Sequence, residues 1–104
     1  VFFAFDQAAL TAESRATLEK NADCIRKQAP KQIVVEGNCD ERGTVEYNLQ
    51  LGQRRAEAVR KYFANLGLPA KSIKTVSFGK ERPVCTEHDE SCWARNRRSD
   101  VIGK

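Results

Sequence analysis

The sequence predicts an α/β domain of the α+β type, a two-layer β-α-β-α-β-(α)-β sandwich whose helices pack on one mixed sheet. Short runs of β-branched and aromatic residues alternate with two long helical patterns, and turn residues separate them. The chain has 104 residues, 40% hydrophobic and 31% charged, which is enough for one modest core and a polar surface. We therefore expect residues 1–104 to form a single domain.

The first half of the chain contains two predicted strands and one helix. "VFFAF" (Val1–Phe5) is aromatic and β-branched and predicts an opening strand. Thr11 is the predicted N-cap of a helix whose apolar residues recur at helical spacing until Pro30 ends it. "QIVVEGN" predicts the second strand. It is apolar on both faces, so we place it in the centre of the sheet or between layers.

The second half begins with the longest helix, predicted from about Val45 to Leu66 and closed by Gly67 and Pro69. "SIKTVSFG" predicts a third strand that ends at Gly79, and "ERPVCTEHDES" reads as a loop. "CWARN" predicts a short helix and "RRSDVIG" the last strand. Trp93 is expected to anchor the short helix in the core.

Charge and hydropathy exclude some classes of protein. The net charge of +4 comes from 18 basic and 14 acidic residues spread along the chain, which is a weak argument for a nucleic-acid partner. No apolar run approaches the roughly 20 residues that a membrane helix needs. The chain opens directly on a predicted strand without a methionine, so we expect a domain of a longer protein whose leader or anchor lies outside this sequence.

The four cysteines indicate a compartment. Cys85 and Cys92 flank a polar loop that a disulfide could close, and such a disulfide would stabilise the fold by about 2–3 kcal/mol. A disulfide between Cys24 and Cys39 is also possible. The alternative is four unpaired small hydrophobic side chains. No C-x2-C spacing occurs and His88 is the only histidine, so we expect neither a metal site nor a cofactor. The favoured location is oxidising, as in a periplasm or outside the cell.

One charged residue of the long helix, Arg55, does not lie on the helix face that is expected to be solvent-exposed. Stepping about 100° per residue from Leu51 places Arg55 at roughly 40°, inside the apolar stripe, and Asn48 at roughly 60°. A guanidinium does not lose its proton, so a semi-buried arginine is expected to need an anionic partner. That partner is either a side chain of the protein or a ligand.

Asp40 is the candidate side chain. It follows the carboxyl end of the second strand, where ligand sites of α/β layers concentrate. Gly43 allows a sharp turn and Thr44 can cap the next helix, which brings Asp40 towards Arg55. The two charges form either a structural salt bridge or a pocket for a zwitterion, with an ammonium facing Asp40 and a carboxylate held by Arg55.

The run "GNCDERGTVEYNLQLGQRRAEAV" resembles the OmpA-like peptidoglycan-binding domain, and within that family it is most similar to the peptidoglycan-associated lipoproteins (Pal). "VFFAFDQAAL", "VSFGKERPV" and "ARNRRSDVI" are similar to the opening strand, the third strand and the closing motif of the family, so the resemblance covers nearly the whole chain. Two departures are Cys39, where many members carry Thr or Ala, and Gly52, where the broader family usually has Ser. The Cys85–Cys92 pair is not a general family feature and suggests a subgroup that braces the loop.

The resemblance implies non-covalent binding of the meso-diaminopimelate residue of peptidoglycan, which carries the zwitterion inferred above. It further implies a periplasmic location, attachment to the outer membrane through a segment outside this chain, and a TolB-like partner in a Tol-Pal type system; a wall-anchoring domain of the flagellar stator MotB type is the alternative. The family's binding residues match Asp40, Arg55, Asn48, Phe5, Asp6 and Gln7. We expect Thr44, Asn96, Arg97 and Arg98 to support the site.

An enzyme acting on peptidoglycan is the other class of function to weigh. It would need two placed carboxylates, a metal or an activated nucleophile. Nothing in the sequence marks a second catalytic carboxyl beside Asp40, and His88 lies in the most polar loop, where we expect it to be exposed. The sequence therefore favours a binding domain.

Overall fold

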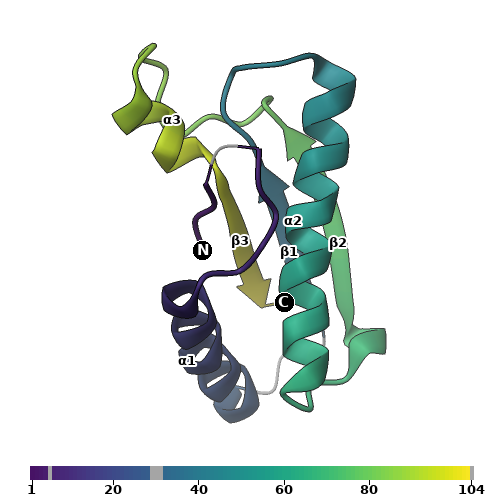
Figure 1. Ribbon diagram of the computed structural model, residues 1–104. Helices are drawn as coiled ribbons and strands as arrows, with labels where there is room; N and C mark the ends of the chain where they lie inside the picture. Colours follow the sequence, from purple (N-terminus) through teal and green to yellow (C-terminus); the bar gives the residue numbers. More distant parts are fainter. Residues whose placement is uncertain (5, 29–31, 104) are drawn as a thin grey trace.

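The computed structural model describes residues 1–4, 6–28 and 32–103, and Figure 1 shows its three helices and three strands. The elements are α1 (Ala12–Gln28), β1 (Ile33–Asn38), α2 (Val45–Asn65), a 3-10 turn (Ala70–Ser72), β2 (Ile73–Gly79), α3 (Glu90–Asn96) and β3 (Arg98–Gly103). The helices pack on one mixed sheet, which confirms the predicted α+β class.

The sheet has the strand order β2-β1-β3. β1 pairs in parallel with β2 and antiparallel with β3, so Ile33 has Ile73 on one side and Gly103 on the other. The central position of β1 explains its apolar character on both faces: Val34 and Val35 are both buried although they point to opposite sides of the sheet. The predicted placement in the sheet centre is confirmed.

The opening strand predicted over Val1–Phe5 is wrong in extent. The segment forms only an isolated bridge between Phe2 and Arg98 of β3. Around this bridge, the Ser99 amide donates to the Val1 carbonyl at 2.8 Å and the Phe3 amide donates to the Arg97 carbonyl at 2.8 Å. The backbone then turns, and its next carbonyls are directed at a side chain of α2 instead of at a strand neighbour. Phe5 lies outside the described residues.

The core forms where α1 and α2 lie against one face of the sheet, with α1 and α3 at opposite ends of the molecule (Figure 1). Phe3 contributes to this core while the neighbouring Phe2 is 59% exposed. The buried cluster comprises Phe3, Leu18, Ala22, Ile33, Val35, Ala56, Val59, Phe63, Leu68 and Ile73. None of the helices in the described part of the chain combines the length and the apolar character needed to cross a bilayer.

Both long helices begin at the predicted caps. The Thr11 hydroxyl accepts from the Ser14 amide at 3.1 Å, and the Thr44 hydroxyl accepts from the Tyr47 amide at the same distance. α2 ends at Asn65, one residue before the predicted end, and Gly67 follows with φ +92°. The stop predicted at Pro30 for the first helix lies outside the described residues.

α2 crosses β1 at a contact between two glycines. A Cβ added to Gly37 would lie 1.8 Å from the carbonyl oxygen of Gly52, and one added to Gly52 would lie 2.3 Å from Ser77 Oγ. The absence of both side chains lets the helix backbone rest on the strand. Arg55, one turn further along α2, is thereby brought against the carboxyl end of β1.

Candidate functional site at the carboxyl end of β1

A small cavity opens where β1 ends and α2 begins. Its volume is about 70 Å³. Its lining residues come from the segment after Phe3, from the connection between β1 and α2, and from the first three turns of α2; they are Asp6, Cys39, Asp40, Arg42, Gly43, Tyr47, Asn48, Leu51 and Arg55. Four of the residues predicted for the site therefore share one cavity: Asp6, Asp40, Asn48 and Arg55.

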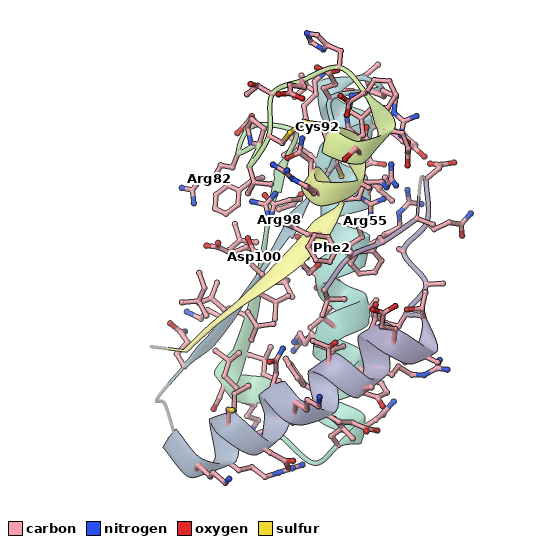
Figure 2. All side chains as sticks on the ribbon, turned by 90° about the vertical axis from the view of Figure 1, so that its left-hand side faces the viewer. Phe2, Arg55, Arg82, Cys92, Arg98 and Asp100 are labelled. Atoms are coloured by element: carbon pink, nitrogen blue, oxygen red, sulfur yellow. A yellow bond between two sulfur atoms is a disulfide. The ribbon has the colours of Figure 1, made fainter. Side chains whose placement is uncertain are left out.

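Arg55, which is labelled in Figure 2, is 1% exposed, and its guanidinium is held by backbone carbonyls. Nε donates to the Gln7 carbonyl at 2.9 Å, Nη1 to the Asn38 carbonyl at 3.0 Å and Nη2 to the Ala4 carbonyl at 3.1 Å. The ring of Phe3 lies 5.3 Å from the guanidinium carbon. Burial lowers the pKa of Arg55, but an arginine stays protonated at any physiological pH.

The structural Asp40–Arg55 salt bridge, one of the two predicted alternatives, is not formed, because three carbonyl dipoles meet the guanidinium and Asp40 pairs with other arginines. The bonds to the carbonyls use three of the five N–H groups that an arginine carries. The Cys39 thiol, which also lines the cavity, is a further side-chain hydrogen-bond partner of the guanidinium. A ligand carboxylate in the cavity could engage the N–H groups that the three carbonyls do not use.

Asp40, which is 4% exposed, pairs with Arg42 and Arg97 instead of Arg55. Its carboxylate accepts from Arg42 Nη2 at 2.8 Å and from the Arg42 amide at 3.0 Å, while Arg97 Nη1 lies at 3.5 Å. Burial alone would raise the pKa of Asp40. The hydrogen bonds from Arg42, with the charge of its guanidinium, outweigh burial and hold that pKa below its usual value.

The two arginines share a second carboxylate, that of Glu90. Arg97 Nη2 lies 2.7 Å from Glu90 Oε1, and Arg42 Nη2 lies 3.7 Å from Glu90 Oε2. Asp40, Arg42, Glu90 and Arg97 therefore form a closed ring of two anions and two cations, which we call the charge ring. Arg97 also donates to the Phe3 carbonyl at 2.9 Å, so the charge ring ties the closing motif to the amino-terminal segment.

A second group of side chains lies next to the cavity, in contact with Arg42. The Arg42 guanidinium lies over the Trp93 ring, 4.2 Å from its centre, and Trp93 Nε1 donates to Glu41 at 2.7 Å. The exposed His88 ring contacts the same Glu41 carboxylate, which raises the pKa of His88. Trp93 is thus half-buried at the edge of the site and not a core anchor, because its indole N–H needs a polar partner.

The remaining predicted binding residues take different positions. Asn48 is buried and donates from Nδ2 to the Arg42 carbonyl at 2.7 Å, which holds the turn that begins at Asp40. Asp6 is exposed at the cavity with φ +56°, a left-handed conformation that aspartate tolerates. Gln7 meets the site through its backbone carbonyl, and Phe5 lies outside the described residues.

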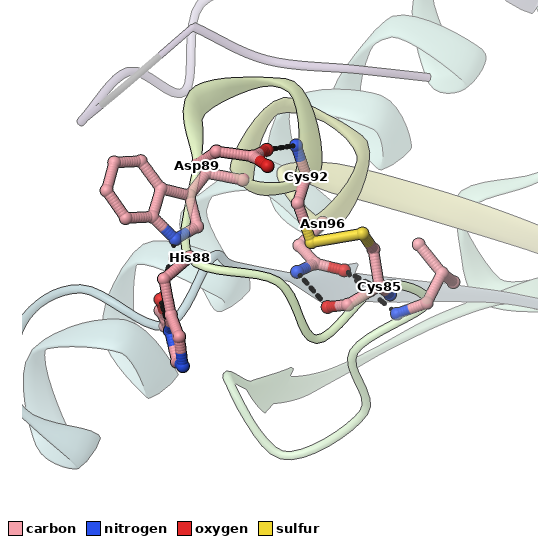
Figure 3. The surroundings of a disulfide bond; sticks show 8 residues. Cys85, His88, Asp89, Cys92 and Asn96 are labelled. Atoms are coloured by element: carbon pink, nitrogen blue, oxygen red, sulfur yellow. Dashed lines mark hydrogen bonds and ion pairs between the residues drawn. A yellow bond between two sulfur atoms is a disulfide. The ribbon is translucent and has the colours of Figure 1, made fainter.

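The predicted supporting residues brace three different segments. Thr44 caps α2, and Arg98 pairs with Asp100 at 3.1 Å on β3. Asn96 holds the loop before α3: its Oδ1 accepts from the Val84 amide at 2.8 Å and its Nδ2 donates to the Cys85 carbonyl at 2.9 Å (Figure 3).

The disulfide between Cys85 and Cys92 closes this loop onto α3, which confirms that prediction (Figure 3). The pairing of Cys24 with Cys39, which the sequence left open, is contradicted because both thiols are free. Cys24 is exposed on α1, whereas Cys39 is buried after β1 and its thiol donates to the Asn48 carbonyl at 3.2 Å. Burial raises the pKa of Cys39, so the thiol stays protonated near neutral pH.

The described residues contain no cluster of three or more histidine, cysteine, aspartate or glutamate side chains that could hold a metal ion. Sequence reasoning missed Arg42 and Trp93 as members of the site, and it expected Arg97 only as general support. The spacing carried one signal for Arg42: it stands two residues after Asp40 in a turn, where a side chain can fold back onto a carboxylate. No pattern along the chain places Trp93 beside them.

Comparisons with known proteins show what the chain is similar to. The profile of the OmpA family matches residues 2–97. The peptidoglycan-associated lipoprotein of Agrobacterium fabrum is 46% identical over 102 residues, which cover 98% of this chain and 58% of that protein. The chain thus spans about three fifths of the length of this relative.

Solved structures agree with this similarity. The crystal structure of the peptidoglycan-associated lipoprotein of Burkholderia pseudomallei superposes with a TM-score of 0.93 at 44% identity, covering 100% of this chain and 88% of that one. The carboxyl-terminal domain of Helicobacter pylori MotB has a TM-score of 0.87 at 22% identity, covering 97% and 79% of the two chains. The second similarity concerns the fold alone.

Proposed function

Since this chain belongs to the OmpA family, we propose that it binds peptidoglycan non-covalently through the meso-diaminopimelate residue of the stem peptide. In this role the domain anchors an outer-membrane lipoprotein to the cell wall. The similarity to peptidoglycan-associated lipoproteins at 46% identity over nearly the whole chain supports the proposal.

The observation that carries the proposal is a carboxylate and a guanidinium, both almost fully buried, on the wall of one cavity. The free end of diaminopimelate carries an ammonium and a carboxylate on one carbon. Asp40 would accept from the ammonium, and the Arg55 guanidinium, on the wall of the same cavity, would donate to the carboxylate. Because Arg55 is already held by three carbonyls, it would pay little conformational entropy when the ligand arrives.

The lowered pKa of Asp40 favours a binding site over a hydrolytic one. A general acid needs a raised pKa, whereas the arginines around Asp40 hold its pKa below the usual value. A carboxylate that stays charged suits a permanent counter-ion of an ammonium. We therefore assign the site no reaction.

Calorimetric titration with two stem peptides tests the proposal. One peptide carries meso-diaminopimelate and the other lysine, which has the ammonium but lacks the terminal carboxylate. We expect the diaminopimelate peptide to bind at least about tenfold more tightly, since a charged hydrogen-bonded group would otherwise stay unpaired. Equal affinities would remove the role of Arg55.

Matched variants assign the two charges. Asp40→Asn and Arg55→Lys should each weaken binding of the diaminopimelate peptide by tenfold or more, because the first removes the anion and the second the planar donor fork. Glu46→Gln and Arg54→Lys change exposed side chains at the start and on the outer side of α2 and should leave affinity unchanged. Site variants that bind like these controls would refute the proposed contacts.

The cellular setting follows from the same proposal. We infer a periplasmic domain that is tethered to the outer membrane by a segment outside this chain and that works with a TolB-like partner in a Tol-Pal type system. The Cys85–Cys92 disulfide is consistent with an oxidising compartment. A stator domain of the MotB type is the weaker candidate, since that similarity stands at 22% identity against 46% for the lipoprotein.

A further inference from the structure

Asp40 has a cation of the protein itself, Arg42, in the place that a ligand ammonium would take. Arg42 reaches its carboxylate with Nη2 at 2.8 Å, Nε at 3.4 Å and the backbone amide at 3.0 Å. Arg42 also lines the cavity. An ammonium can take its place beside the Asp40 carboxylate only if the Arg42 guanidinium moves away.

Of the two arginines that line the cavity, Arg42 is the one that is able to move. Its side chain is 30% exposed, whereas those of Asp40 and Arg55 are almost completely enclosed. Asn48 and Arg55 are also fixed by hydrogen bonds to backbone carbonyls on neighbouring segments. Movement of the Arg42 side chain leaves these bonds intact, since Asn48 binds the carbonyl of residue 42 and not its guanidinium.

A second position for the Arg42 guanidinium is already present on the outer side of the cavity. Glu90 Oε2 lies 3.7 Å from Nη2, and the Trp93 ring lies under the guanidinium at 4.2 Å. A shift of about 1 Å towards Glu90 would shorten that ion pair to hydrogen-bond distance. The guanidinium, now 4.2 Å from the centre of the Trp93 ring, would still lie within the roughly 6 Å over which a cation–π contact acts.

We propose that Arg42 is an internal counter-ion of Asp40 that the ammonium of the ligand displaces, and that Glu90 and the Trp93 ring receive the displaced guanidinium. The proposal rests on the proposed function and adds a residue that controls affinity and specificity. Each carboxylate of the charge ring keeps a cationic partner during the exchange: Asp40 gains the ammonium and Glu90 gains Arg42. A ligand without an ammonium cannot replace Arg42 and leaves the cavity closed.

The ligand binds only those molecules in which Arg42 has left Asp40. The apparent affinity is therefore the intrinsic affinity multiplied by the fraction of such molecules. A half-exposed ion pair shifts such an equilibrium by up to about fivefold. Removing the competing guanidinium should therefore raise the affinity by up to about that factor. Removing the receiving carboxylate should lower it, since Arg42 would then have only Asp40 as an anionic partner within the charge ring.

Titration of two variants with the diaminopimelate peptide tests these opposite signs. We expect Arg42→Gln to bind about three- to fivefold more tightly than the unmodified chain, and Glu90→Gln to bind several-fold more weakly. Arg54→Gln and Glu87→Gln, which change exposed side chains outside the charge ring, are the matched controls. Unchanged or weakened binding by Arg42→Gln overturns the proposal, because it would make Arg42 inert or a direct ligand contact.

Trp93 offers a second measurement that a purely structural role of Arg42 would not affect. It is the only tryptophan of the chain, and the Arg42 guanidinium lies directly over its ring. The diaminopimelate peptide should change Trp93 fluorescence in the unmodified chain, with the same midpoint as the calorimetric titration. In Arg42→Gln the peptide should bind with little fluorescence change, and an undiminished change there would contradict displacement.

The two proposals fail in different ways. If the diaminopimelate peptide does not bind the unmodified chain, both are refuted. If it binds and prefers diaminopimelate over lysine, but Arg42→Gln does not bind more tightly, the proposed function stands and only the displacement of Arg42 is refuted. Urea denaturation of each variant shows that the chain is folded at the titration temperature, so that a change in affinity reports on the site.

Discussion

Replacing Arg55 by methionine tests whether this side chain holds the fold as well as the ligand. Methionine keeps most of the apolar stem that packs in the stripe of α2 but removes all three hydrogen bonds to carbonyls. Those bonds join three segments that are distant in sequence: the turn around residues 4–7, the end of β1, and α2. Replacement by alanine would also create a cavity, so the loss of hydrogen bonds could not be separated from the loss of packing.

The magnitude follows from where the three carbonyls lie. The bond to the Asn38 carbonyl is buried, so its loss leaves an unpaired acceptor at a cost of about 2 kcal/mol. The carbonyls of Ala4 and Gln7 belong to exposed residues and can hydrogen-bond to water instead. Losing each of these two bonds therefore costs about 1 kcal/mol of stability. Methionine also removes the desolvation cost of the buried charge, which offsets about 1 kcal/mol of this loss. We expect Arg55→Met to lower the free energy of unfolding by about 3 kcal/mol.

Urea denaturation followed by circular dichroism measures this loss as a lower midpoint at an unchanged slope. Arg54→Met changes the adjacent exposed side chain and should stay within about 0.5 kcal/mol of the unmodified chain. A loss below about 1 kcal/mol for Arg55→Met would show that the carbonyls find other partners at little cost and would refute the reasoning. The expected loss also means that an alanine variant of Arg55 reports on folding as well as on binding.

Three further perturbations follow from the structure. The pKa of Asp40 is lowered in the folded chain, so its charge stabilises the fold at any pH above the unfolded pKa of about 3.9, and this stabilisation is lost as the pH falls through the lowered pKa. In urea titrations from pH 7 to pH 2, the difference in unfolding free energy between the unmodified chain and Asp40→Asn should therefore narrow below about pH 4. Replacing Cys85 and Cys92 by alanine should cost about 2.5 kcal/mol, whereas Cys24→Ser should cost less than about 0.5 kcal/mol, and a dithiothreitol-treated sample should match the double variant. Gly37→Ala should lower the free energy of unfolding by about 3 kcal/mol, since the new Cβ would lie 1.8 Å from a backbone oxygen of α2, and a thermal midpoint within 2 °C of the unmodified chain would contradict that contact.

The elements themselves could be predicted because their signals are local. Thr11 and Thr44 mark helix starts whatever the rest of the chain does, and the periodicity of α2 identifies the face on which Arg55 lies. The opening strand could not be predicted in the same way. Its aromatic composition favours a strand, but after Phe3 the backbone carbonyls serve the Arg55 guanidinium, and this competing partner comes from a residue about fifty positions away.

The sequence by itself determined which charges are out of place: Arg55 within an apolar stripe and Asp40 at the end of a buried strand. Only the tertiary structure decided their partners. Helical periodicity gives a direction for a side chain, but a hydrogen bond or an ion pair forms between whichever groups the packed elements bring within about 3 Å. Packing gave Arg55 three carbonyls and surrounded Asp40 with Arg42 and Arg97.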